Sequence, residues 1–241
     1  MPTLDDIIKD IHAKQFKRNY LRVDPVEFKK DLEAIGNAVV ESGVFKIGKH
    51  NKATYNMLAK YYVGSTDFEN KSYTLTVFED ENEKKLTFNH SYKKGVCLCG
   101  QFGSGKSDCM TIFNYVSKRY GIGLHSQKLN CKTLEVDFKA FGYEYLMRFK
   151  KGVWLLEDLG LEELQTKHFG TNDNIIEAVI NMLYDNWRDT GTPVFITTNL
   201  NAKAMYERYG KRLAERIFEM CNFLTLSGEN LRPDKVVTIE K

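Results

Sequence analysis

The stretch "CGQFGSGKSD", residues 99–108, decides the fold of this chain. It contains the pattern G-x-x-x-x-G-K-[ST], which runs from Gly100 to Ser107. The apolar run before it, "GVCLCG" (95–100), predicts a buried strand, and the apolar residues that recur at helical spacing after it predict a helix. A glycine-rich loop between a strand and a helix directs backbone N–H groups and the helix N-terminus at one anion. The stretch therefore predicts a phosphate-binding loop.

The residues of this loop have distinct predicted roles. Glycine lets the backbone approach the phosphates closely, Lys106 brings a positive charge to the β and γ phosphates, and the Ser107 hydroxyl is a ligand for magnesium. The predicted nucleotide-binding residues are Gly100, Gly103, Ser104, Gly105, Lys106, Ser107 and Asp108.

Two further predicted strands end in polar residues. The run "GVWLLEDLG" (152–160) ends with Glu157 and Asp158, and "PVFITTN" (193–199) ends with Asn199. In open α/β sheets, ligands bind at the carboxyl ends of the strands, so these side chains are expected beside the phosphate loop. Glu157 would hold the magnesium with Ser107, Asp158 would polarise the attacking water, and Asn199 would orient that water.

Each of these roles has an alternative. Glu before Asp reverses the commoner order of the two acids, so only one of them could be active, with slow hydrolysis as the result. Taken alone, Asn199 at the end of a strand better fits a side chain that caps a turn.

From about residue 93 onward, apolar runs alternate with helical patterns, which is typical of a parallel sheet covered by helices. The predicted strands are 95–100, 133–138, 152–160, 193–199 and 222–228. Upstream, helices are predicted over 24–42 and 51–63 and a β-hairpin over 72–89. The expected fold class is α/β with a five-stranded parallel sheet. We divide the chain into a helical extension, 1–50, which could bind a partner, and a nucleotide-binding domain, 51–241.

The composition is that of an ordinary globular protein, with 42% hydrophobic residues, 28% charged residues and a net charge of +3. The near balance of charge excludes a strongly basic nucleic-acid coat. The amino-terminal residues contain an early acidic pair and no long apolar run, so we expect no membrane segment and a cytoplasmic protein. Five cysteines without the paired spacing of a zinc site are expected to be reduced core residues.

The segment "YERYGKRLAERIFEMCNF" (206–223) predicts a helix on which Arg208, Arg212 and Arg216 follow one another at four-residue intervals. This spacing places the three arginines on one helix face. An arginine that enters the nucleotide site of a neighbouring subunit stabilises the transferring phosphoryl group. The segment therefore predicts one of two arrangements. Either an arginine reaches the nucleotide of a neighbouring subunit, or the arginines form a helix face that is exposed to solvent.

Four segments in this order, "KKGVCLCGQFGSGKS", "FKKGVWLLEDLG", "ITTNL" and "YGKRLAERIFEM", resemble the DnaC-type branch of AAA+ ATPases. This branch contains bacterial and phage replicative helicase loaders and the IstB-like transposition ATPases. The resemblance covers about residues 93–232. It implies a Walker A loop from Gly100 to Ser107, a Walker B pair at Glu157 and Asp158, and a sensor at Asn199.

The same resemblance implies an arginine finger at Arg216, in preference to Arg212, and a nucleotide-facing arginine at Arg232. It also implies a core without a carboxyl-terminal helical lid, which fits the short stretch of 14 residues from Gly228 to Lys241.

The function implied is that of an ATP- and Mg-dependent ATPase that loads a replicative helicase for DNA replication. Such a protein would be a homo-oligomer through an interface at Arg216 or Arg212 and would bind single-stranded DNA. Aromatic side chains that could stack on bases lie beside basic ones: Phe141, Tyr143, Tyr145 and Phe149 beside Arg148, Lys150 and Lys151.

Two other functions remain open. One is an IstB-like transposition regulator that assembles on duplex DNA, for which residues 1–60 would carry the basic contacts. The other is a scaffold that binds ATP but hardly hydrolyses it.

Overall fold

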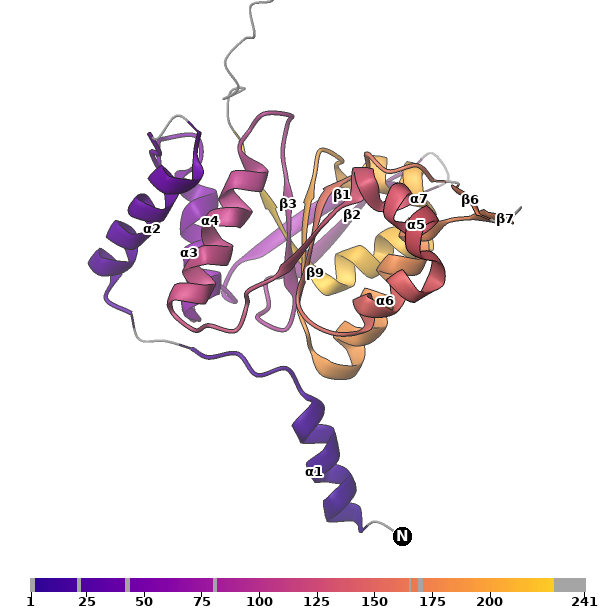
Figure 1. Ribbon diagram of the computed structural model, residues 1–241. Coiled ribbons are helices and arrows are strands. Elements are labelled where there is room, and N and C mark those ends of the chain that lie inside the picture. Colours follow the sequence, from indigo (N-terminus) through magenta and orange to yellow (C-terminus); the bar gives the residue numbers. More distant parts are fainter. Residues whose placement is uncertain are drawn as a thin grey trace, which may run out of the picture.

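A five-stranded parallel sheet forms the centre of the molecule, which is a computed structural model describing residues 3–20, 23–41, 44–79, 82–164, 166–168 and 171–227 (Figure 1). The strand order is β4-β5-β8-β3-β9, and every pair in the sheet is parallel. The strands are β4 (Gln127–Asn130), β5 (Trp154–Leu159), β8 (Val194–Thr198), β3 (Gly95–Cys99) and β9 (Cys221–Thr225). The predicted fold class is confirmed.

One predicted strand is wrong. Residues 133–138 form the end of a 3₁₀ turn, η1 (Cys131–Thr133), and the start of helix α5 (Leu134–Leu146). Leu134 and Phe138 are four residues apart and both buried, so this run follows a helical period. The fifth strand is instead β4, an edge strand in which only Leu129 is buried. It therefore lacks the apolar run that marks a central strand.

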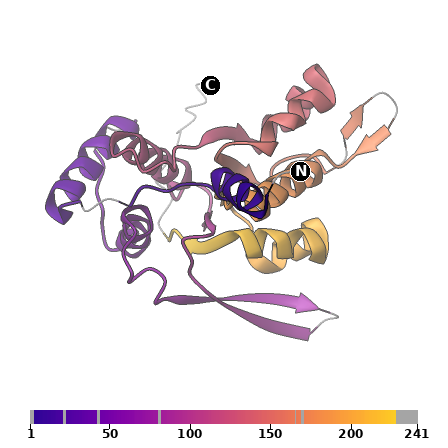
Figure 2. The same ribbon diagram turned by 90° about the horizontal axis from the view of Figure 1, so that it is seen from below.

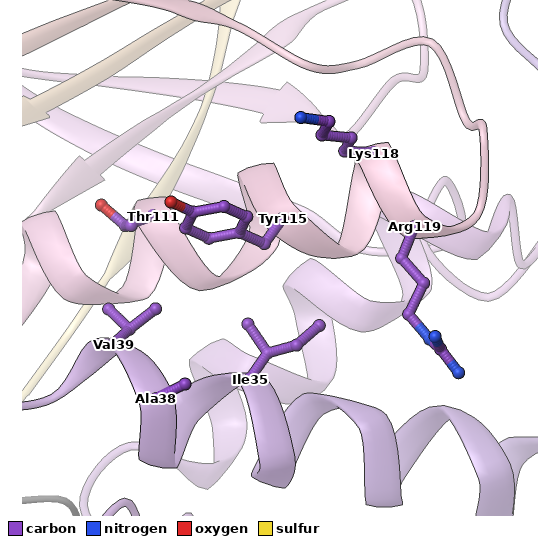
Figure 3. Close-up of a pocket in the computed structure, with 7 residues that line it drawn as sticks. All are labelled: Ile35, Ala38, Val39, Thr111, Tyr115, Lys118 and Arg119. Carbon is purple, nitrogen blue, oxygen red and sulfur yellow. The ribbon is translucent and has the colours of Figure 1, made fainter.

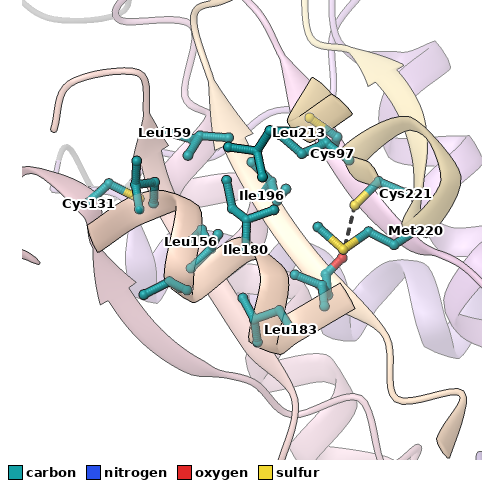
Figure 4. Packing of buried hydrophobic residues seen from close by; sticks show 14 of the residues in the cluster. Cys97, Cys131, Leu156, Leu159, Ile180, Leu183, Ile196, Leu213, Met220 and Cys221 are labelled. Atoms are coloured by element: carbon teal, nitrogen blue, oxygen red, sulfur yellow. Dashed lines mark hydrogen bonds between the residues drawn. The ribbon is translucent and has the colours of Figure 1, made fainter. Parts of the chain in front are cut away.

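Helices cover both faces of the sheet. On one face lie α2 (Pro25–Val39), α3 (Lys52–Val63) and α4 (Lys106–Arg119), and on the other lie α5, α6 (Ile175–Thr190) and α7 (Ala202–Met220) (Figure 1). Strand side chains alternate between the two layers. Figure 4 shows the second layer, where Leu156 and Ile196 of the strands pack against Ile180, Leu183 and Leu213 of the helices. The helices predicted over 24–42 and 51–63 are confirmed as α2 and α3.

All five cysteines are free thiols inside or at the border of the core. Four are buried and Cys99 is half-buried. The Cys221 thiol donates a hydrogen bond to the Val194 carbonyl at 3.4 Å (Figure 4), and burial raises the pKa of the Cys109 thiol to about 12. The expectation of reduced core cysteines is confirmed.

The predicted hairpin is confirmed as β1 (Ser72–Glu79) paired with β2 (Asn82–Asn89) in antiparallel register. It forms a long ribbon at one side of the molecule (Figure 2). The Tyr73 hydroxyl joins it to the sheet by donating to the Cys221 carbonyl at 3.0 Å.

The remaining elements are short or stand apart from the core. They are α1 (Leu4–Lys14), η2 (Met147–Lys150) and the small antiparallel pair β6 (Thr166–His168) and β7 (Thr171–Asp173). Helix α1 stands away from the core at the amino-terminal end (Figure 1). Among the helices of the described residues, none has the length and apolar character needed to cross a membrane.

Helix α7 differs from the helix predicted over 206–223. It begins earlier because the Asn201 side chain caps it, accepting a hydrogen bond from the Ala204 N–H at 2.9 Å. It is also interrupted at Gly210, where φ is 77° and ψ is 162°. Arg208 lies before this interruption, whereas Arg212 and Arg216 lie after it. The prediction that all three arginines share one face is therefore wrong.

Candidate nucleotide-binding site

The phosphate loop joins β3 to α4 in a tight path that requires its glycines. Gly103 and Gly105 have φ values of 80° and 81°, in the region that favours glycine. At Gly100, an added Cβ would lie 2.4 Å from the Leu226 carbonyl oxygen. The loop therefore brings its backbone to the N-terminus of α4, where N–H groups are available to an anion.

Lys106, the first residue of α4, is held in this loop with only 5% of its surface exposed. Its Nζ donates to the carbonyls of Gly100 (2.9 Å) and Gln101 (2.8 Å) and to Asn199 Oδ1 (2.7 Å). The structure thus brings together two predicted site residues that are 93 positions apart in the sequence. The phosphate oxygens of a bound nucleotide carry more negative charge than these three acceptors. They would accept hydrogen bonds from the same ammonium group.

The loop also contains an unsatisfied polar atom. Ser104 is buried, and its Oγ has no hydrogen-bond partner within the part of the chain that the structure describes. Ser107 and Asp108 are exposed in the first turn of α4. A buried hydroxyl without a partner is costly unless a ligand completes it. This hydroxyl is therefore a candidate partner for a phosphate oxygen bound in the loop.

The two acids lie at a bulge in β5. Leu156 pairs with Ile196 and Leu159 pairs with Thr198, so two residues, Glu157 and Asp158, oppose one residue of β8. Asp158 has φ 57° and is the one non-glycine residue with positive φ in the described chain. Its N–H donates to Thr197 Oγ1 at 3.0 Å. Bulges of this kind redirect a side chain beside a site, and Asp is among the residues that tolerate left-handed backbone best.

Glu157, the predicted magnesium ligand, forms an ion pair. Its Oε1 lies 3.2 Å from Lys128 Nζ, and the same ammonium group donates to Thr111 Oγ1 at 2.7 Å. Lys128 comes from β4, the strand that the sequence pattern did not reveal. Magnesium at Glu157 would compete with this lysine for the carboxylate.

We expect Lys128→Met to lower the magnesium concentration needed for half-maximal ATP turnover by about two- to fivefold, since partly exposed ion pairs contribute about 0.5–1 kcal/mol. A magnesium titration at saturating ATP measures this change. Lys132→Met is the control, because Lys132 is exposed and lies outside the pair. A higher magnesium requirement in Lys128→Met would contradict competition.

The arginines of α7 have different surroundings. Arg216 donates a hydrogen bond to Asn181 of α6, and its guanidinium lies 4.9 Å from the centre of the Tyr184 ring. Arg212 is exposed. Arg208 is bound to Glu162, which follows β5. Arg232 lies outside the described residues.

Sequence reasoning missed two charged residues near the site, Lys128 and Glu162. Lys128 falls in a polar stretch with no strand signal, and Glu162 lies in "LGLEEL" (159–164), which has the appearance of an exposed loop. In each case the residue is identified by an ion pair with a partner that is distant in the sequence. Lys128 pairs with Glu157, and Glu162 pairs with Arg208.

A groove lies between α2 and α4 (Figure 3). Its volume is about 830 Å³, and it is lined by Ile35, Ala38, Val39, Thr111, Tyr115, Lys118 and Arg119. In Figure 3 the apolar side chains of α2 face Tyr115 and Thr111 of α4. No residue from the phosphate loop lines the groove, but its Thr111 accepts a hydrogen bond from Lys128, the partner of Glu157.

Comparison with known proteins finds similarity in structure. No protein-family model and no curated protein sequence matches the chain. The crystal structure of DnaI is 19% identical over 85% of this chain and 93% of its own, with a TM-score of 0.54. A candidate primosome component from Streptococcus pyogenes serotype M3 is 16% identical over 83% and 99%, with a TM-score of 0.52. The chain shares the fold of these structures.

Proposed function

We propose that this chain is an ATP-dependent loader of a replicative helicase. The observation that carries the proposal is the meeting of predicted site residues at one edge of the sheet. The adjacent strands β5, β8 and β3 end, respectively, at the acid pair, at Asn199 and at the phosphate loop. The fold shared with DnaI and with a candidate primosome component supports a role in replication.

At this edge the chain has side chains suited to ATP and magnesium. Lys106 and the backbone of the loop would bind the phosphates, with Gly100, Gly103, Ser104, Gly105 and Asp108 forming its walls. Ser107 and Glu157 would hold magnesium, which supplies positive charge to the phosphates. Asp158 would accept the proton of the attacking water, and Asn199 would orient that water.

Single-stranded DNA is the second proposed ligand, and α5 provides exposed aromatic side chains for it. Phe141 and Tyr143 are 67% and 59% exposed on either side of Gly142, which has φ 62° and interrupts the helix. Exposed aromatic rings stack on bases without regard to sequence. The two other predicted stacking residues differ: Phe149 is fully buried and Tyr145 is half-buried, hydrogen-bonded to Asp137. We therefore assign stacking to Phe141 and Tyr143 alone.

The test of the proposed function is ATP turnover measured over a range of protein concentrations, without DNA, with single-stranded DNA and with duplex DNA. A loader is expected to show stimulation by single strands that becomes steeper as protein concentration rises. A preference for duplex would favour the IstB-like alternative. Absence of turnover in all three conditions would contradict both and leave the ATP-binding scaffold.

The arginine-finger assignment predicts that Arg216→Ala retains ATP binding by the monomer but loses the rise in turnover with protein concentration. Removing such an arginine costs about 10³-fold or more in the best-studied cases. Arg216 must leave Asn181 to enter a neighbouring site, whereas Arg212 is already exposed. Arg212→Ala is therefore the matched variant. If only Arg212→Ala loses the concentration dependence, the finger is Arg212.

A further inference from the structure

Glu162 is a buried acid that the proposed nucleotide chemistry does not use. It lies in the loop after β5, and its side chain is 1% exposed. Oε1 accepts a hydrogen bond from the Tyr209 hydroxyl at 2.6 Å and from Arg208 Nε at 3.3 Å. Oε2 accepts from the Gly160 N–H at 2.8 Å. A carboxylate so far from water is stable only with such partners, so this side chain binds the loop to the first half of α7.

These partners lie next to the parts of the molecule that the proposed function uses. Gly160 is two residues after Asp158, at the end of the bulged strand. Arg208 and Tyr209 immediately precede the interruption of α7 at Gly210. Arg208 also donates to the Glu162 carbonyl, which fixes the loop backbone as well as the side chain. Glu162 therefore joins the strand of the predicted acids to the point where α7 changes direction.

The two halves of α7 form ion pairs with different parts of the structure. The first half is bound to the β5 loop through Glu162, whereas Lys211, just after Gly210, forms an ion pair with Glu79 at the end of β1. Gly210 has positive φ and no atom within 4 Å of an added Cβ, so it can act as a joint between the halves. The Tyr206 hydroxyl of the first half also donates to Glu215 of the second half at 3.1 Å, so a shift of the loop would be transmitted across this joint.

The Tyr209 hydroxyl of this cluster keeps its proton far above neutral pH. Burial, together with the negative charge of Glu162, raises the pKa of the Tyr209 hydroxyl well above its usual value. The phenol therefore remains a donor to the carboxylate.

We propose that Glu162 is a positioning residue that couples the β5 loop, and with it the state of the nucleotide site, to the half of α7 that contains Arg212 and Arg216. Through this link, nucleotide in one subunit would set the position of the arginines that the subunit presents to its neighbour. The inference rests on the proposed function, because it requires nucleotide at the phosphate loop.

The test is hydrogen exchange of the full chain with and without a non-hydrolysable ATP analogue and magnesium. In the wild type, the analogue is expected to change exchange of the amides of residues 211–220 by at least about threefold. Glu162→Gln removes the charge and nearly preserves the shape. It should bind the analogue within about twofold of the wild type yet lose most of this change. Glu163→Gln, at the exposed neighbouring position, is the control and should behave as the wild type.

Tyr209→Phe is the second variant, because it removes one hydrogen bond and leaves the ion pair with Arg208 intact. It should show an intermediate loss, and it carries the test if Glu162→Gln unfolds below the assay temperature. In a double-mutant cycle, Glu162→Gln with Arg208→Gln should lose less of the exchange response than the sum of the two single losses.

Two results would overturn the coupling: a wild-type α7 that does not respond to bound analogue, or an equal response in Glu162→Gln and the wild type. Failure of the wild type to bind the analogue would instead contradict the proposed function.

Discussion

The Lys106→Ala variant is expected to bind ATP at least roughly 100-fold more weakly than the wild type. The ammonium group is buried in the loop and already held by three oxygens, so it is positioned before nucleotide arrives. A hydrogen bond to a charged group contributes about 1.5–3 kcal/mol, and Lys106 is expected to make at least one such contact to each of two phosphates. Titration with a fluorescent ATP analogue in the presence of magnesium measures the loss.

Lys118→Ala is the matched control for this variant. Lys118 lies on the same helix and is exposed, and its removal should change the Kd for ATP by less than about twofold. Thermal melting of both variants separates lost binding from lost folding. Unchanged ATP affinity in a folded Lys106→Ala variant would contradict the candidate site and the function proposed from it.

The parts of the site that the sequence predicted are those whose signal is local. The phosphate loop has its glycines, lysine and serine within eight residues, and the central strands β3, β5 and β8 are apolar runs because both of their faces are covered. The neighbouring positions of Lys106 and Asn199 then follow from the carboxyl ends of adjacent parallel strands.

The parts that the sequence did not predict depend on distant partners. Strand β4 is a strand because it pairs with β5, since three of its four residues are exposed. The charge of Glu162 is buried only because Arg208 and Tyr209 cover it, and neither residue is near it in the sequence. Local propensity contains no information on such contacts.

The order of the acids, Glu157 then Asp158, acquires a physical reason in the structure. In an unbulged strand the two side chains would point to opposite faces of the sheet. Here the bulge gives residue 158 a φ of 57°, which costs most residues about 1–2 kcal/mol but costs Asp and Asn less. An acid that must be adjacent to Glu157 and adopt this conformation is therefore better supplied by Asp than by Glu.

Asp158→Asn is expected to lower ATP turnover by about 10²–10³-fold while leaving the Kd for ATP within about threefold of the wild type, because a positioned general base contributes roughly that much to rate. Asn tolerates the same left-handed backbone, and the hydrogen bond from the residue 158 N–H to Thr197 is unaffected by the change. The variant thus removes the charge and preserves the bulge. Single-turnover hydrolysis and equilibrium binding of ATP, measured on one preparation, separate the two effects.

The double variant Glu157→Asp with Asp158→Glu distinguishes two explanations of the order of the acids. In one, the bulge selects Asp at position 158; in the other, the natural order slows hydrolysis. If the bulge selects Asp at position 158, the reversed order places Glu in a left-handed conformation, lowers the free energy of unfolding by about 1 kcal/mol and does not increase turnover. A large gain in turnover with unchanged stability would show instead that the natural order slows the enzyme. Asp158→Asn would still lose activity in that case, because the residue would remain the base that accepts the proton from water.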